Sequence, residues 1–297
     1  MAADALRLRP GRARGRTGVV RGGRFRAGGL LRFVYIALFT IFLLAPFYWV
    51  AVTSIKPVDD YLTTPPVWFP AHPTGVHFST ALNQMRGWLG LKNSLIIAIA
   101  VTVASVVIGT SAAYSMARFP GKATKHLAFW FLSQRFLPPV AVVIPIFLMY
   151  RSLTLNDSRL GLIILYTVFS LPFSIWMMYA YFRQMPVELE EAALVDGCSR
   201  WQSLWKIAWP LAAPGIVSAA AFAFIFSWTE FLFALVLTSS KAVTLPVAIA
   251  GTATGFQGAQ YGETSALTIV SLIPALLLGT LVQKHLVRGL TLGAVQG

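Results

Sequence analysis

The stretch that decides the fold is Pro186–Gly215, PVELEEAALVDGCSRWQSLWKIAWPLAAPG, which separates two long apolar segments. It carries Glu188, Glu190, Glu191 and Asp196, which are four of the ten acidic residues in the chain. So many acidic residues beside apolar runs indicate a polar loop that contacts something outside a membrane.

The local chemistry of this loop predicts two short helices. Pro186 suits the first position of a helix, where a backbone N–H has no partner, and the glutamates that follow oppose the positive end of the helix dipole. Gly197 can end that helix in a left-handed conformation. One stripe of the helix contains Leu189, Ala192, Ala193 and Asp196, and the two alanines would let another surface approach closely. A second amphipathic run places Trp201, Leu204, Trp205 and Ala208 on one side, and we expect Pro210 to stop it.

The bulk composition places the chain in a bilayer. Hydrophobic residues make up 57% of its 297 residues and charged residues 11%, whereas soluble domains carry about 25% charged residues. One cysteine and four scattered histidines give no zinc spacing. The chain has no G-x-x-x-x-G-K-[ST] loop, so any use of ATP must come from a partner.

Apolar stretches of bilayer length, about 20 residues each, predict an all-α membrane protein with six spans. Their expected limits are Leu30–Val52, Ser94–Ala117, Leu127–Tyr150, Gly161–Phe182, Gly215–Thr238 and Ser265–Gln283. The first stretch is too long for a signal-peptide core, and no cleavage site follows it. Residues 1–29, which contain eight arginines, are expected to be a disordered cytoplasmic arm, and residues 30–297 a transmembrane domain with a cytoplasmic loop at residues 183–214.

The lysines and arginines between the spans predict the sidedness. The side that holds both termini has 17 of them and the opposite side has six, with Arg135 inside a span. Because cytoplasmic loops carry the excess of basic residues, both termini and the glutamate-rich loop are expected in the cytoplasm. The proline-rich segment of residues 55–93 is expected to be an extended external loop, and residues 239–264 to be external and to approach the membrane.

Unusual residues inside the spans suggest packing or transport. Ser105, Gly109 and Ala113 form a small-xxx-small ridge that favours close helix packing. Pro138, Pro139, Pro145 and Pro172 interrupt helices, which suits either a transport pathway or simple kinks. Charged residues within the bilayer usually face a cavity or a partner. The candidates are Gln134, Arg135, Trp228, Thr229 and Glu230, which either line a solute route or, for the Arg135–Glu230 pair, lock two helices together.

The order of residues in the acidic loop resembles a known pattern. The pattern is E-A-A, then three residues and G, then nine residues and I-x-x-P. It is matched by Glu191, Ala192, Ala193, Gly197, Ile207 and Pro210. This resembles the EAA loop of the membrane subunits of ABC importers. Trp209 departs from the leucine that the family usually carries before the proline.

Further stretches extend the resemblance to the MalG-type permeases of carbohydrate ABC importers. They are KNSLIIA from Lys92, AAYSMARFPGK from Ala112, PIFLMYRSLTLNDSRLGLII from Pro145, SWTEFLFALVLTSSKAVTLPVAI from Ser227 and the ending LVRGLTLGAVQG. Near that end, Gln296 replaces the family's common lysine.

The resemblance implies a type I ABC importer permease fold in the bacterial cytoplasmic membrane, with no catalysis by this chain. The implied partners are a MalF-like second permease, two ATPase subunits that bind ATP and Mg²⁺, and an external solute-binding protein that delivers a sugar, oligosaccharide or polyol. The coupling residues would be Glu188, Glu191, Ala192, Ala193, Asp196, Gly197, Ile207 and Pro210.

Other classes remain open at this point. A proton- or ion-driven secondary transporter could use Arg135 and Glu230 as a relay, although such carriers need no docking helix and commonly show inverted repeats. A membrane scaffold without transport would not need intramembrane charges. Within the ABC class, import of amino acids or phosphate is the nearest competitor.

Overall fold

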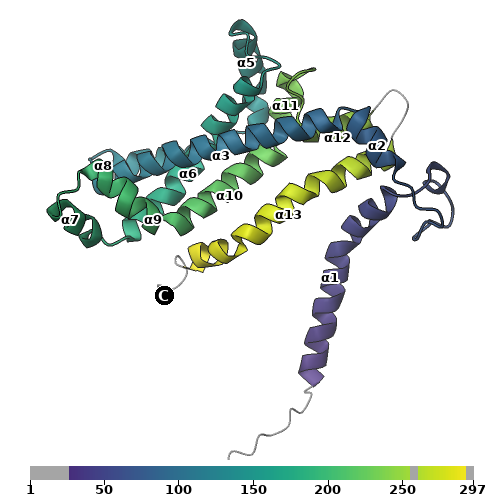
Figure 1. The fold of residues 1–297 in the computed structure, drawn as a ribbon, viewed down its shortest axis with the longest axis horizontal. Coiled ribbons are helices and arrows are strands. Elements are labelled where there is room, and N and C mark those ends of the chain that lie inside the picture. The colour runs from purple at the N-terminus through teal and green to yellow at the C-terminus, as the bar shows by residue number, and fades with distance from the viewer. Residues whose placement is uncertain (1–26, 255–259, 292–297) are drawn as a thin grey trace, which may run out of the picture. The chain divides into compact units, whose positions relative to one another are not determined.

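The computed structural model describes residues 27–254 and 260–291, and every regular element in these ranges is a helix (Figure 1). The predicted basic arm lies outside the described residues except for its last three positions, as does Gln296. The chain divides into two structural units, residues 1–47 and 48–297. Helix α1 (Ala27–Thr53) supplies the described part of the first unit, and the second unit contains all the other helices.

Four helices in the described ranges are long and apolar enough to cross a membrane by themselves: α1, α3 (Gly87–Arg118), α6 (Arg159–Gln184) and α13 (Tyr261–Thr291). A fifth candidate combines α10 (Ala213–Thr229) with the preceding segment Arg200–Leu211, and these two parts are bent by 78°. The sequence therefore predicted more continuous spans than the structure contains, and two of the predicted spans are broken.

The predicted span Leu127–Tyr150 is wrong as a single helix. It consists of α4 (Thr124–Ser133), the short 3-10 helix η2 (Gln134–Phe136) and α5 (Pro139–Ser152). Leu137 and Pro138 between them are extended, with ψ values of 117° and 125°. The cause is the Pro138–Pro139 pair, because a residue that precedes a proline is kept out of the helical region.

The predicted span Gly215–Thr238 is also broken. Helix α10 ends at Thr229, Glu230 is extended with ψ of 129°, and α11 (Leu232–Leu237) follows. Within a membrane such a break is tolerated only where its backbone groups find partners. The Glu230 side chain provides them, since its carboxylate accepts hydrogen bonds from the backbone N–H groups of Phe233 and Ala234 at 2.9 and 3.2 Å.

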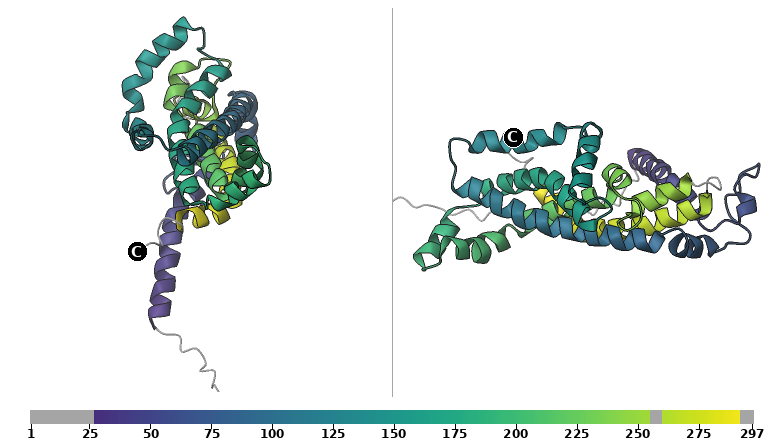
Figure 2. Two further views of the ribbon diagram at one scale, coloured as in Figure 1. Left: turned by 90° about the vertical axis from the view of Figure 1, so that its left-hand side faces the viewer. Right: turned by 90° about the horizontal axis from the view of Figure 1, so that it is seen from above.

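Helix α3 is the central element of the second unit and packs against α6 and α10, while α13 packs against α10 (Figures 1 and 2). The ridge of small residues on α3 (Ser105, Gly109 and Ala113) packs against α6, as its four-residue spacing indicated. Ser105 and Ala113 are fully buried, and a Cβ on Gly109 would lie 2.9 Å from the Cβ of Ser174 on α6. Small residues therefore set the distance between α3 and α6.

The two ends of α3 meet different groups of short helices. One end lies near α2 (Val76–Asn83) and α12 (Leu245–Ala253), and the other near α7 (Glu188–Val195) and α8 (Arg200–Ser203) (Figure 1). The region predicted as an extended loop thus contains α2 and a 3-10 helix, η1 (Val58–Asp60). A 32-residue helix is about 48 Å long, so the two groups are separated by more than a bilayer core.

Candidate functional site

The first helix of the acidic loop forms and ends as predicted, but the expectation that Pro186 is its first residue is wrong, because Val187 is the N-cap. Helix α7 begins at Glu188, two residues after Pro186, and Gly197 after its end has a φ of +87°. The N–H of Cys198 donates to the carbonyl of Ala193 at 2.9 Å and the N–H of Gly197 to that of Leu194 at 3.1 Å. This pair of bonds is a Schellman motif, which a left-handed glycine makes possible.

The face of helix α7 that is exposed to solvent carries both charged and apolar side chains. The exposed residues on and just after the helix are Glu188, Leu189, Glu191, Ala192, Val195, Asp196 and Gly197. The expectation that Ala193 shares this face is wrong, because its side chain is 7% exposed and turned into the chain. Ala192 alone therefore provides the small side chain at which another surface can approach closely.

Glu190 faces inward and anchors the helix. One of its carboxylate oxygens lies 2.7 Å from a terminal nitrogen of Arg118, and Arg118 Nε donates to the same oxygen at 2.8 Å. The other oxygen accepts a hydrogen bond from the Tyr114 hydroxyl at 2.7 Å. Only 6% of the Glu190 side chain and 7% of the Arg118 side chain are exposed. Paired and hydrogen-bonded in this way, both charges can be buried.

Arg118 also connects the loop to α6. Its guanidinium donates to the carbonyl of Phe182 at 3.0 Å and to that of Met185 at 3.2 Å, and these carbonyls belong to the end of α6, where backbone acceptors lack helical partners. One side chain thus joins α3, α6 and α7. Sequence reasoning missed Glu190 and used Arg118 only as a loop charge; the available signal was an arginine in the last turn of a span opposite an acidic loop.

The second part of the loop differs from the prediction. Helix α8 starts with a capping box between Ser199 and Gln202, and the helical path then continues through a π-helical segment (Leu204–Ala208) and α9 (Trp209–Leu211). Pro210 therefore does not stop the helix, because the widened turn before it accommodates the missing N–H.

The predicted apolar side of this second helix is also divided. Leu204 and Ala208 are buried, whereas Trp201 is 63% and Trp205 37% exposed. Ile207 is half-buried, and Pro210 is exposed. The indoles of Trp205 and Trp209 stack at 4.4 Å between ring centroids, so the unusual Trp209 extends a row of rings along the helix.

Glu230 lies at the break between α10 and α11, and its carboxylate is hydrogen-bonded within this chain. Besides the two backbone N–H groups of α11, its carboxylate accepts a hydrogen bond from the Tyr166 hydroxyl of α6. Arg135 lies in η2, and its side chain is outside the described residues. The structure accordingly gives Glu230 a capping function in this conformation.

A cleft of about 420 Å³ opens beside this break. It is lined by Trp228, Thr229, Phe231, Pro246, Ile249, Ala250, Thr268 and Ser271. Thr229 is exposed, whereas Trp228 is 3% exposed and its indole N–H donates to the carbonyl of Ser271 at 3.2 Å. Of the predicted route residues, Thr229 is the one with an exposed side chain in the cleft; its hydroxyl donates to the carbonyl of Ile225 at 2.8 Å and can still accept a hydrogen bond from a solute.

Gln134 belongs to a different hollow. It lies between α4, α5 and α6 in a pocket of about 610 Å³ that is lined otherwise by apolar residues and Tyr150. The predicted route residues therefore fall into two separate places, and the structure does not bring Gln134 into the cleft of Thr229.

Comparison with known proteins identifies the family. The model of a family described as the inner membrane component of binding-protein-dependent transport systems matches residues 105–292, which include the acidic loop and both breaks. This chain belongs to that family. Members of this family are permease subunits of ABC transporters and are not themselves enzymes.

Relatives of this permease match it along most of its length. The diacetylchitobiose uptake permease DasC of Streptomyces coelicolor is 35% identical over 86% of this chain and 92% of its own length. The trehalose transport permease SugB of Mycobacterium tuberculosis is 38% identical over 86% of this chain and 93% of its own length. The trehalose/maltose permease MalG of Thermococcus litoralis is 34% identical over 90% of this chain and 97% of its own.

A solved structure has the same fold. A chain of a bacterial ABC transporter involved in the import of the polysaccharide alginate superposes with a TM-score of 0.75 at 22% identity, over 89% of this permease and 99% of that chain. The expected type I ABC importer permease fold is thus confirmed. The broken helices of this chain explain why a simple hydropathy reading predicts too many continuous spans.

Proposed function

We propose that this permease crosses the bacterial cytoplasmic membrane six times, with both termini in the cytoplasm. Four single helices and the bent α10 segment supply five spans, and the broken pair α4 and α5 supplies the sixth. The proposal rests on the distribution of basic residues, 17 on the side of the termini against six on the other. It places α7 in the cytoplasm and α2 and α12 outside.

Its solute is a carbohydrate: a sugar, an oligosaccharide or a polyol. This proposal is supported by the relatives, whose names refer to diacetylchitobiose, trehalose and maltose. The cleft beside α10 fits the same class, because it combines aromatic rings with the hydroxyls of Thr229, Thr268 and Ser271. Since the Glu230 carboxylate is occupied by the α11 cap, the cleft offers hydroxyls and no free charge.

ATP would be hydrolysed by partner subunits. In this proposal the permease pairs with a MalF-like second permease, two ATPase subunits bind ATP and Mg²⁺, and an external binding protein delivers the solute. The exposed face of α7, with Glu191 and Ala192 at its centre, would lie in a cleft of one ATPase subunit, where Glu191 would pair with a basic residue.

The observation that carries the coupling role is the rigid attachment of α7. Its outward face is free, and its inward face is fixed through Glu190 to Arg118 at the end of α3. A push on α7 is therefore transmitted to α3 and α6 rather than absorbed by a flexible loop. Closure of the ATPase pair would tilt these helices and open the cavity toward the binding protein, and hydrolysis would reset it.

The coupling role is tested in liposomes that contain the complete assembly. Replacing Glu191 and Gly197 together by alanine is expected to abolish ATP-driven uptake and the increase in ATPase rate caused by loaded binding protein, while membrane insertion stays intact. Asp59→Asn, an exposed acidic residue at the other end of the molecule, is the matched control. Uptake at the wild-type level by the double variant would remove the assigned role.

The solute route is tested by Thr229→Val, which keeps the side-chain shape and removes the hydroxyl. Uptake of the transported sugar is expected to fall several-fold with a raised KM, while basal ATPase activity is kept. Trp228, Gln134, Arg135 and Glu230 remain route candidates with weaker support, because two of them, Trp228 and Glu230, already serve this chain's own packing. Uptake that survives ATP depletion but collapses with the proton gradient would instead favour the ion-coupled alternative.

A further inference from the structure

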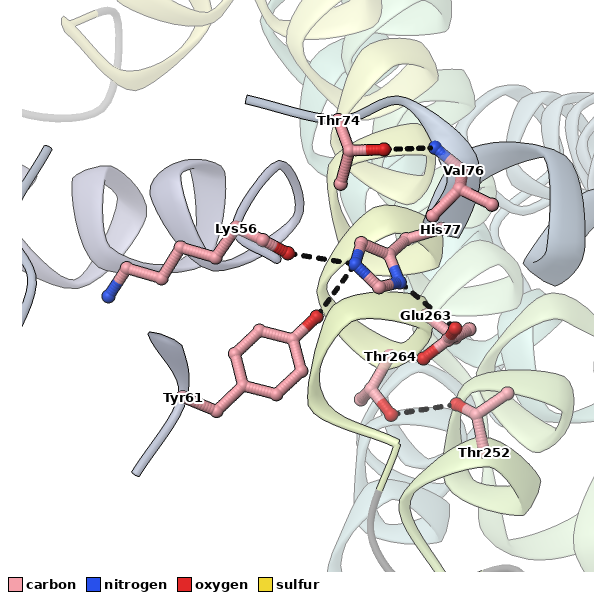
Figure 3. A network of polar contacts seen from close by, with 8 residues as sticks. All are labelled: Lys56, Tyr61, Thr74, Val76, His77, Thr252, Glu263 and Thr264. Atoms are coloured by element: carbon pink, nitrogen blue, oxygen red, sulfur yellow. Dashed lines mark hydrogen bonds and ion pairs between the residues drawn. The ribbon is translucent and has the colours of Figure 1, made fainter. Parts of the chain in front are cut away.

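A buried histidine joins three segments at the end of the molecule opposite α7. His77 lies in the first turn of α2, and only 2% of its side chain is exposed. Its Nδ1 is 3.0 Å from a carboxylate oxygen of Glu263 in the first turn of α13, and its Nε2 is 2.8 Å from the carbonyl oxygen of Lys56 (Figure 3). The Tyr61 hydroxyl lies 2.8 Å from the same Nε2.

The partners of the ring decide how many protons it needs. The Lys56 carbonyl can only accept a hydrogen bond, and an ionised Glu263 carboxylate can only accept one as well. Both ring nitrogens must therefore carry a proton to satisfy both acceptors, and this is the imidazolium form. When the ring is neutral and its Nδ1–H stays with Glu263, Nε2 can accept only from the Tyr61 hydroxyl, and the Lys56 carbonyl loses its donor.

Tyr61 is suited to serve as this alternative donor. Burial, with a further contribution from the negative charge of Glu263, raises the pKa of Tyr61 to about 12, so its phenol keeps its proton throughout the range in which histidine titrates. Two other titratable side chains border the cluster. Tyr261 packs edge-on against Tyr61, and the Lys56 ammonium lies 4.1 Å from the centroid of the Trp49 ring.

The fit around the ring leaves no spare space. A Cβ on Gly262 would lie 2.1 Å from the Tyr61 hydroxyl oxygen and 2.6 Å from ring atoms of His77. A rearranged ring has no room to recover a lost bond by moving toward α13. The loss of one proton therefore changes the partner of Nε2 in the segment after α1, from the Lys56 carbonyl to the Tyr61 hydroxyl.

We propose that His77 is a proton-dependent positioning residue, whose charged ring holds the Lys56 carbonyl at the first turn of α13 and whose neutral ring gives up that bond and keeps only the bond from the Tyr61 hydroxyl. The proposal goes beyond the coupling and solute roles and does not depend on them. If this end of the molecule is external, as proposed above, the proton concerned is that of the outer medium, and acid favours the state in which His77 donates to the Lys56 carbonyl.

The test measures hydrogen exchange in residues 54–61 of the assembled permease in nanodiscs, corrected for intrinsic exchange. As the pH is raised from about 5 to 9, wild-type protection of this segment is expected to fall several-fold, because a bond from a charged donor is replaced by a weaker bond to a neutral ring. His77→Gln should remove the pH dependence. His72→Gln, at an exposed histidine in the same loop, should leave it unchanged.

The variant Glu263→Gln distinguishes an effect of the charge on His77 from an effect of the hydrogen bond between residues 77 and 263. The new amide can donate to Nδ1, so a neutral ring with its proton on Nε2 can still donate to the Lys56 carbonyl. This variant is expected to stay protected at every pH in the range. Wild-type protection that does not change with pH, or a Glu263→Gln variant with the wild-type pH dependence, would overturn the proposal.

A transport readout complements the exchange data. The external pH profile of uptake is expected to be flatter in Glu263→Gln than in wild type, with His72→Gln following wild type. An assembly that transports no sugar would count against the proposed function, whereas the exchange experiment needs no transport and would still decide the role of His77.

Discussion

The guanidinium of Arg118 and the carboxylate of Glu190 form an ion pair at 2.7 Å that is almost closed to solvent and joins the end of α3 to the inner face of α7. The pair has a third member in Tyr114, whose hydroxyl donates to the second carboxylate oxygen. It makes the short helix α7 a rigid extension of the membrane-spanning part, which a connection by loops alone would not do.

Removing one member of this ion pair should strongly destabilise the attachment of α7. Glu190→Ala leaves the Arg118 charge buried without an anionic partner, which costs about 3–5 kcal/mol. Hydrogen exchange in residues 186–199 should rise strongly, and coupled ATPase activity should be lost. Glu188→Ala, on the exposed face of the same helix, should leave exchange near the wild-type value.

A paired replacement distinguishes the charge from the packing. In Arg118→Met with Glu190→Leu, no unpaired charge remains, so stability should recover relative to either single variant. Equal destabilisation in the single and double variants would show that the pair is not the source of the effect. Thermal unfolding in detergent provides the measurement.

The left-handed glycine after α7 should tolerate a side chain only at a cost in backbone strain. The space around Gly197 is open, so Gly197→Ala is penalised by its φ of +87° alone, by about 1–2 kcal/mol. Gly197→Asn should cost less, because asparagine adopts this conformation more readily. Limited proteolysis of the loop would rank the three proteins, with Gly121→Ala as a control at a glycine with open space and no such φ.

The contact between α3 and α6 should be sensitive to a single methyl group. In Gly109→Ala the new Cβ meets the Cβ of Ser174 at 2.9 Å, so overpacking should lower the unfolding free energy by about 1–3 kcal/mol. Gly279→Ala in α13 adds the same group to a helix where nothing lies within 4 Å. That variant should be neutral or slightly stabilising, and a comparable loss of stability in both variants would contradict the packing explanation.

Asp157 should hold two loops together down to strongly acidic pH. Burial alone would raise the pKa of this carboxyl, but hydrogen bonds from the backbone of Ala242, Lys241 and Ser239 and from the Ser240 hydroxyl lower its pKa well below the usual value. Because the folded-state pKa is depressed, its stabilising effect is complete above the ordinary pKa of an unfolded aspartate, near pH 4, and is lost only as pH falls toward the folded value.

The corresponding variant should behave differently at neutral pH. Asp157→Asn removes the charge that the donors surround, so hydrogen exchange in residues 239–242 should rise even at pH 7. In the wild type the same segment should open only in strong acid. Asp59→Asn, at an exposed carboxylate, should match the wild type at both pH values.

The sequence by itself determined the membrane class, the helical character, the family and the position of α7, because these depend on local composition, on residue spacing and on a glycine that must adopt a positive φ. It also indicated the packing role of the Ser105–Gly109–Ala113 ridge, since small residues at four-residue spacing have few other uses in a span.

Only the tertiary structure decided which charges are buried and where helices break. Glu190 and Glu191 are neighbours in the same acidic run, yet one faces Arg118 and the other solvent, and composition cannot distinguish the two directions. Glu230 was read as a route residue, but its carboxylate caps the helix that begins after it. The His77–Glu263 contact joins residues 186 positions apart, and such long-range pairs form only once α2 and α13 have packed together.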